Sequence, residues 1–309
     1  MTPRPKPVKG EMNLVKLIEQ FRSEDACRER LAELRWPDGV ECPRCKTKKV
    51  TPYAKRQQYD CRECDYRFSV TSGTIFADSK LPLWKWFLAC YLICESKKGI
   101  SANQLKRTLS VTYKTAWYLC HRIRDAMGDG TESPLRGIIE ADETWHGGKR
   151  RNVGSGPYSA GNKVTVVGAV ERDGEIRLRL VGGRDRATLA KFLDEVVAQD
   201  AEALYTDSWA GYVGKGMERH ADKHEAVDHS AYQWVRGDIH TNTVESVWSL
   251  FKRSVIGSYH QISVKHLPAY LDELEWRFNN RENPYLFRDT MTKLVQTDPL
   301  TYKKLVKAA

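Results

Sequence analysis

The first 136 residues carry apolar positions at helical spacing, interrupted by one Cys-rich stretch. Helices are predicted over 12–34, with a break near Ser23, and over 83–96, 99–111 and 112–127. Ser101 and Thr112 are suited to cap the last two helices, which a tight turn joins. Two short helices in this order are typical of a helix-turn-helix unit, and also of an ordinary three-helix scaffold.

From residue 137 the pattern changes to short runs of β-branched and alternating residues. Strands are predicted over 137–144, 163–171, 175–183, 202–207 and 223–228. Helices are predicted over 186–199, after the third strand, and over 239–253, after the fifth. This order predicts an α/β fold with a mixed five-stranded sheet, which matches the ribonuclease H-like arrangement.

Four cysteines in the N-terminal part have the spacing of a metal site. They form two C-x2-C pairs, Cys42 with Cys45 and Cys61 with Cys64, separated by fifteen residues that fit a short β-hairpin. Zn²⁺ takes four thiolates in a tetrahedron, and each pair supplies two from one tight turn. We therefore expect a zinc ribbon with a closed, structural site. The other four cysteines, Cys27, Cys90, Cys94 and Cys120, lie on apolar helical faces and are expected in the core.

The length of the chain and the distribution of its charges indicate how many regions it has and which class of partner it binds. The chain has 309 residues and a net charge of +10. Residues 1–136 hold 26 Lys and Arg against 16 Asp and Glu, whereas residues 137–309 hold 24 of each. A surplus confined to one part is typical of a polyanion-binding module. We expect N-terminal helices with a zinc ribbon (1–72), a helical DNA-binding region (73–136), a catalytic α/β domain (137–285) and a C-terminal tail (286–309).

Three acidic residues stand where the expected fold would bring them together. Asp142 lies on the first strand, Asp207 ends the fourth, and Glu245 lies on the helix after the fifth. Three such carboxylates can hold two divalent cations about 3.5–4 Å apart for phosphoryl transfer. Oxygen ligands favour Mg²⁺, with Mn²⁺ as a substitute. Glu140 and Glu143, on the same strand as Asp142, are rival candidates.

The stretches "ADETWHGGKR", "LYTDSWAGY" and "HTNTVESVWSLFKR", behind a zinc ribbon, resemble the ISXO-type insertion-sequence transposases of the DDE superfamily. The resemblance covers nearly the whole chain and implies that Asp142, Asp207 and Glu245 are the catalytic triad. It also implies that Lys252, seven residues after Glu245, contacts DNA phosphate at the active site. Some branches of the family carry Asn at the third position, which leaves Asn242 as an alternative. His240 is expected to orient the helix entry and not to bind metal.

The predicted DNA contacts lie in two places. On the helix over 112–127 we expect Tyr113 and three candidate contacts, Lys114, Tyr118 and Arg122, to face outward. Lys149 and Arg150 lie in a Gly-rich basic segment, 146–163, which suits either a loop on DNA or a solvated linker. Arg253 stands beside Lys252 and is a further candidate.

The resemblance implies a transposase that binds the terminal inverted repeats of its element, cleaves the strands with Mg²⁺ and joins the ends to target DNA. It implies double-stranded DNA as the partner, with a homodimer or larger assembly on it. A silent DNA-binding regulator and a structure-selective nuclease of the same fold are the alternatives. No apolar run approaches the roughly 18 residues of a membrane helix, and the basic start lacks the apolar core of a secretory signal. We expect a cytoplasmic, nucleoid-associated prokaryotic protein.

Overall fold

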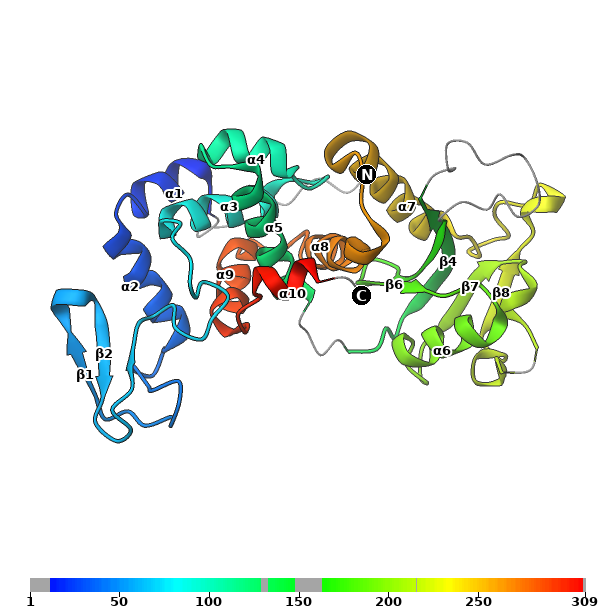
Figure 1. The fold of residues 1–309 in the computed structure, drawn as a ribbon. Coiled ribbons are helices and arrows are strands. Elements are labelled where there is room, and N and C mark those ends of the chain that lie inside the picture. Colours follow the sequence, from blue (N-terminus) through cyan, green and yellow to red (C-terminus); the bar gives the residue numbers. More distant parts are fainter. Residues whose placement is uncertain (1–11, 129–132, 148–162, 215, 308–309) are drawn as a thin grey trace. The chain divides into compact units, whose positions relative to one another are not determined.

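The computed structural model describes residues 12–128, 133–147, 163–214 and 216–307. The chain divides into two compact units (Figure 1). Unit 1 comprises residues 1–129 and 280–309, and unit 2 comprises residues 130–279. The expected C-terminal tail is therefore not a separate region, because the chain returns to unit 1 after unit 2.

Unit 1 begins with two helices and a three-stranded ribbon. Helices α1 (Leu14–Gln20) and α2 (Glu24–Arg35) are capped by Asn13 and Ser23, whose side chains accept backbone N–H groups of the first turn. The predicted break near Ser23 is confirmed. Strands β1 (Val50–Tyr53) and β2 (Gln58–Cys61) form the predicted hairpin, and β3 (Arg67–Phe68) pairs with β2.

The rest of unit 1 is helical: α3 (Leu83–Glu95), α4 (Ala102–Leu109), α5 (Tyr113–Gly128), α9 (Leu286–Gln296) and α10 (Tyr302–Val306). Ser101 and Thr112 accept backbone N–H groups at the starts of α4 and α5, as predicted. Helix α9 packs against α2, α3 and α5. The ring of its Phe287 lies 6.1 Å from Phe87 and 6.5 Å from Phe21. Residues 286–296 thus complete the core of unit 1.

The division into units sharpens the charge asymmetry. By sequence, unit 1 holds 31 Lys and Arg against 18 Asp and Glu, and unit 2 holds 19 against 22. The whole positive surplus therefore lies in unit 1, and the returning C-terminal segment increases it.

Unit 2 contains the mixed sheet predicted from the sequence. Its strands are β4 (Ile138–His146), β5 (Val164–Glu171), β6 (Ile176–Val181), β7 (Ala203–Asp207) and β8 (His224–Val227), in the order β6-β5-β4-β7-β8. The pairs β6–β5 and β5–β4 are antiparallel, whereas β4–β7 and β7–β8 are parallel. All five predicted strands and the α/β class are confirmed. The expected fold also places the first and fourth strands side by side, which the pairing of β4 with β7 confirms.

Helices cover both faces of this sheet (Figure 1). On one face, α6 (Arg186–Val196) packs its Leu189 and Leu193 against Ile139 and Leu204 of the sheet. On the other face, α7 (Asn242–Ser254) and α8 (Leu267–Asn279) form a second core around Trp248. A π-helical turn (Val255–Tyr259) follows α7.

From the sequence, the late helical segment 263–281 is expected to carry its acids on a solvated face, but two of these acids are buried on α8. Glu273 is fully buried and accepts a hydrogen bond from the Tyr259 hydroxyl (2.7 Å). Glu275 is buried and accepts the backbone N–H of Leu178 on β6 (2.7 Å). These carboxylates tie α8 to its neighbours, because a buried carboxylate needs hydrogen-bond donors.

Candidate active site and four-cysteine site

The four predicted zinc ligands meet at the base of the ribbon. Their Sγ atoms all lie within 4.8 Å of one another, with Cys42 3.7 Å from Cys64 and Cys45 3.5 Å from Cys61. A tetrahedron with Zn–S bonds of about 2.3 Å has S···S edges of about 3.8 Å. The donor set and its spacing therefore fit Zn²⁺.

The two cysteine pairs are built alike. The residue after each second cysteine has a left-handed backbone, with φ of 61° at Lys46 and 48° at Asp65. This conformation turns the chain back, so that the Cys42 N–H reaches the Thr47 carbonyl and the Cys61 N–H reaches the Tyr66 carbonyl. Each turn brings two thiols to one point, as the sequence spacing predicts.

Asp142 and Asp207 lie level with each other on neighbouring parallel strands. Glu140 of β4 is paired with Tyr205 of β7, and the same offset of 65 residues relates Asp142 to Asp207. Glu140 contacts the start of α7, and side chains two residues apart in a strand share a face. Both aspartates therefore point to the face of the sheet that α7 covers.

Trp248 of α7 fixes the Asp142 carboxylate. Its indole N–H donates to Asp142 Oδ2 at 2.9 Å. The residue opposite Asp142 on β5 is Gly168, and a Cβ there would lie 2.7 Å from the Trp248 ring. Gly168 therefore leaves the space that the indole needs to reach Asp142.

The acids share an electrostatic environment that disfavours three negative charges. Burial raises the pKa of Asp142 from 3.8 to about 7, and the nearby charges of Glu143 and Asp207 contribute to this rise. Burial also raises the pKa of Glu143. The Tyr212 hydroxyl donates to Glu143 Oε2 at 2.9 Å, and the Arg184 guanidinium lies 3.6 Å from Oε1. A cation at this point would relieve the repulsion.

Glu245 lies on α7 but does not join a preformed cluster. Its Oε1 accepts the Thr241 hydroxyl at 2.9 Å and lies 4.0 Å from His229 Nε2. In the described part of the chain, the four cysteines are the only group of three or more Cys, His or acidic residues whose ligand atoms meet within 4.8 Å. The charges of Asp142, Glu143 and Asp207 thus interact although their oxygens do not form such a group, and Glu245 is exposed on α7. Asn242, one turn earlier, is also exposed.

Glu140 has a different role from the aspartates. It is fully buried and accepts the backbone N–H groups of Thr243 (2.7 Å) and Val244 (3.1 Å) at the start of α7. Arg172 donates to it at 2.8 Å, and His240 Nδ1 lies 3.1 Å from it. With these partners Glu140 anchors α7 on the sheet, and His240 is the helix-entry residue that the sequence indicated.

Comparison with known proteins gives the family. Residues 134–279 match the model of an ISXO2-like transposase domain, and residues 22–67 match that of a transposase zinc-ribbon domain. An uncharacterized protein of the transposable element ISH50 of Halobacterium salinarum is 30% identical over 277 residues, which are 84% of this chain and 92% of that protein. The chain belongs to the ISXO2-like transposase family.

Two further similarities are weaker. An uncharacterized transposase-like protein of Haemophilus influenzae is 30% identical over 96 residues, 31% of this ISXO2-like chain and 74% of that protein. Among solved structures, a Mos1 strand transfer complex matches with a TM-score of 0.30 and 13% identity, over 68% of this chain and 75% of that one. A pre-cleavage Mos1 transpososome matches with a TM-score of 0.29 and 13% identity, over 70% and 79%.

Two of the three DNA contacts that we predicted on α5 are engaged in the fold of the ISXO2-like chain. Arg122 does not face outward: it is buried, donates to the carbonyls of Ile75 and Ala77, and lies over the Trp86 ring. The Tyr118 hydroxyl donates to the Leu300 carbonyl. Lys114 is exposed, as predicted, with its ammonium 4.4 Å from the Tyr302 ring centroid.

The remaining basic candidates divide into two groups. Lys252 and Arg253 are exposed in the last turn of α7. Lys252 lies seven residues, or two turns, after Glu245, so both side chains project from the same side of the helix. Lys149 and Arg150 lie outside the described residues.

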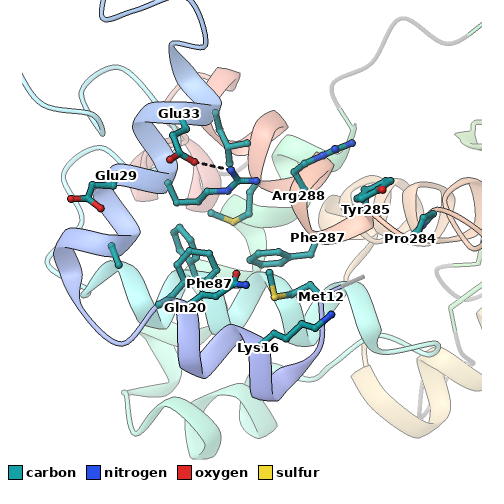
Figure 2. Close-up of a pocket in the computed structure, with 15 residues that line it drawn as sticks. Met12, Lys16, Gln20, Glu29, Glu33, Phe87, Pro284, Tyr285, Phe287 and Arg288 are labelled. Atoms are coloured by element: carbon teal, nitrogen blue, oxygen red, sulfur yellow. Dashed lines mark hydrogen bonds and ion pairs between the residues drawn. The ribbon is translucent and has the colours of Figure 1, made fainter. Parts of the chain in front are cut away.

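A hollow of about 610 Å³ in unit 1 is separate from these sites. It is lined by residues of α1, α2 and α9 together with Phe87 of α3, and Glu33 pairs with Arg30 there at 2.8 Å (Figure 2). None of the predicted site residues lines it.

In the described part of the chain, no helix is both long enough and apolar enough to span a membrane.

The side chains that bind Asp142 and Glu143 were not among the functional residues predicted from the sequence. By helical spacing, Trp248 forms an apolar stripe with Val244, Val247 and Phe251, which predicts only packing. Its bond to Asp142 depends on Gly168 in a distant strand. Tyr212, the last residue of "LYTDSWAGY", was not singled out although its hydroxyl binds Glu143. Both are aromatic residues with a hydrogen-bond donor, and both stand in a motif that contains an acidic residue. This combination could have identified them from the sequence.

Proposed function

We propose that the chain is an active DDE transposase that cleaves the ends of its element and joins them to target DNA. The placement of Asp142 level with Asp207, beneath the helix that carries Glu245, supports this proposal most strongly. The strand order β6-β5-β4-β7-β8, with its antiparallel and parallel halves, also supports a ribonuclease H-like catalytic domain.

The residues present fit a divalent metal site. Asp142, Asp207 and Glu245 would hold Mg²⁺ or Mn²⁺, because carboxylate oxygens are the ligands that these ions prefer. The bound ions would activate the attacking water or 3′-hydroxyl and stabilise the leaving oxygen. The raised pKa of Asp142 supports the fit, since burial and the charges of Glu143 and Asp207 disfavour its charged form and a bound cation would offset them.

The protein's own side chains orient the acids and receive the substrate. Trp248 keeps the Oδ2 atom of Asp142 in place. Glu140 fixes the start of α7, which carries Glu245. Lys252 and Arg253 offer exposed cations for the DNA backbone.

Without bound metal, the charged form of the Asp142 carboxylate should destabilise the folded protein. We expect Asp142→Asn to raise the free energy of unfolding by about 1–3 kcal/mol near pH 8 in EDTA. The pKa of Asp142 is higher in the folded protein than in the unfolded chain, so the protonated carboxyl favours folding. This contribution to the free energy of unfolding is lost as pH rises from 3.8 to about 7. Urea denaturation across this range should show the gain of the variant growing with pH. Mg²⁺ should stabilise the wild type more than the variant. An equal stability of both proteins at every pH would contradict the assignment.

Unit 1 is the proposed DNA-binding module. Its positive surplus supports this, and the pair α4–α5 supports a helix-turn-helix reading of DNA. Exposed cations of this pair are Lys106 and Arg107 in the last turn of α4 and Lys114 in the first turn of α5. We propose that a homodimer or larger assembly forms on DNA, because two ends must be cut and joined.

Substitution of these cations should weaken DNA binding without unfolding the protein. We expect Lys106→Ala with Lys114→Ala to reduce the slope of log affinity against log salt by about one for each phosphate that is no longer neutralised. Arg122→Ala should instead lower the melting temperature, because it removes a buried cation from two carbonyls. Anisotropy over a salt series measures the first effect and thermal denaturation the second, both with the full chain. If the slope of log affinity against log salt is unchanged in the double variant, Lys106 and Lys114 of α4–α5 do not contact DNA phosphates.

The proposed function can be tested in cells with a marker placed between the segments that flank the gene. Supplying the protein should move the marker to a second plasmid, and the flanking segments should contain inverted repeats. A silent DNA-binding regulator would bind these segments without moving the marker. A structure-selective nuclease would cut DNA without requiring the repeats.

A further inference from the structure

Each of the two aspartates is followed closely by a tryptophan that has no role in the proposed function. Trp145 comes three residues after Asp142, and Trp209 comes two residues after Asp207. Both are partly exposed, at 49% and 37% of their surface. Large aromatic side chains usually contribute to folding by being buried, so this exposure needs another explanation.

One arginine joins the two tryptophans. The Arg184 guanidinium lies 3.9 Å from the Trp209 ring centroid and 5.2 Å from the Trp145 ring centroid. The Trp209 indole N–H donates to the Arg184 carbonyl at 3.3 Å. These contacts fix the orientation of both rings without burying them. We call this set, Trp145, Arg184 and Trp209, the Trp–Arg–Trp ladder.

The ladder is attached directly to the acidic site. The Trp209 backbone N–H donates to Asp207 Oδ1 at 3.1 Å. Arg184 lies 3.6 Å from Glu143, and its side chain remains 40% exposed. The ladder therefore borders Asp207 through Trp209, and it borders Glu143, the neighbour of Asp142, through Arg184.

This combination matches the chemistry of an unpaired nucleotide. A base stacks on an aromatic ring whatever its sequence, and a guanidinium binds phosphate or stacks beside the ring. Where the DNA end unpairs beside the scissile phosphate, the released base requires a surface on which to stack.

We propose that the Trp–Arg–Trp ladder stacks the unpaired base next to the scissile phosphate while Arg184 binds the adjoining phosphate. This inference rests on the proposed function, because it assigns a nucleotide subsite to the same active site. The ladder would stabilise the unpaired state of the DNA end, whereas the carboxylates would hold the metal at the scissile phosphate.

The test compares two duplexes that carry the element end, one fully paired and one mismatched at the nucleotides beside the cleavage position. Cleavage by the full chain in Mg²⁺ is measured for the wild type, Trp145→Ala, Trp209→Ala and Trp209→Phe. We expect each Ala variant to cut the paired end about 10- to 100-fold more slowly than the wild type. On the mismatched end each should come within about threefold of the wild type, because unpairing is already complete. Trp209→Phe should retain most of the activity on the paired end.

Trp84→Ala is the matched control, since Trp84 is 40% exposed on α3 in unit 1. It should leave the ratio of paired to mismatched cleavage at the wild-type value. Ala variants of the ladder that are equally slow on both ends, or normal on both, would overturn the inference. A wild type that cuts neither end would instead contradict the proposed function. The ladder would then be tested by binding alone: the wild type should prefer the mismatched end, and Trp209→Ala should abolish that preference.

Discussion

We expect Asp142→Asn and Asp207→Asn each to lower the rate of DNA strand cleavage by about a thousandfold or more. Each change keeps the side-chain shape but removes a charge that would hold the metal. In the Asp142→Asn variant the new amide oxygen can still accept the Trp248 N–H, so the fold should remain intact. DNA binding should persist or strengthen, because the repulsion between carboxylate and phosphate is relieved.

The measurement is cleavage of a labelled duplex carrying the element end, at saturating Mg²⁺, with binding followed in parallel. Asp222→Asn is the matched control, since Asp222 is an exposed aspartate of the same unit. It should cleave at the wild-type rate. Wild-type cleavage by either active-site variant would show that the aspartate is not a metal ligand.

The second large effect concerns the zinc site. We expect Cys45→Ser to reduce bound zinc from one ion per chain to none and to unfold the ribbon β1–β3. The ribbon has a small core, formed by Trp36, Tyr59 and Phe68, whose rings lie 5.5–6.0 Å apart. Structural Zn²⁺ contributes roughly 10–16 kcal/mol of binding free energy in small zinc domains, which this core cannot replace. Binding of the element end should weaken, while the secondary structure of unit 2 should persist.

Elemental analysis and limited proteolysis of protein purified without chelator measure the two parts of this result. Cys90→Ala is the matched control: Cys90 is a buried cysteine of α3 outside the ribbon. It should keep one zinc ion per chain. A Cys45→Ser protein that retains zinc and an uncleaved ribbon would disprove the site.

Local sequence signals predicted the elements and their order. The spacing of Cys42, Cys45, Cys61 and Cys64 is sufficient for the knuckles, because each pair lies within one turn. The strand pattern placed Asp142 beside Asp207, because parallel strands that are neighbours fix the register of their ends. Ser23, Ser101 and Thr112 marked helix starts through their own side chains.

Features set by distant partners were not predictable in this way. Arg122 has the charge of a surface residue, yet it is buried because the carbonyls of Ile75 and Ala77 accept its N–H groups. Glu275 is buried because a backbone N–H on β6 needs an acceptor. The return of α9 to unit 1 depends on its fit to Phe87, which no local pattern encodes.

The third ligand lies on α7, where Glu245 and Asn242 are one turn apart. Glu245 bonds to Thr241 and is partly exposed, and Asn242 is exposed at the first turn of the same helix. Glu245 remains our assignment because its carboxylate can ligate Mg²⁺ with a full charge, whereas an amide oxygen is a weaker ligand. Lys252, on the side of α7 that carries Glu245, supports the same choice.

We propose that Asp142, Asp207 and Glu245 together hold the metal that cleaves DNA. The most direct test is the Mg²⁺-dependent cleavage rate of Glu245→Gln compared with that of Asn242→Ala, with Glu202→Gln as an exposed control in unit 2. We predict that Glu245→Gln abolishes cleavage while Asn242→Ala and Glu202→Gln retain it. Loss of cleavage in Asn242→Ala, with normal cleavage in Glu245→Gln, would show that Glu245 is not the third ligand.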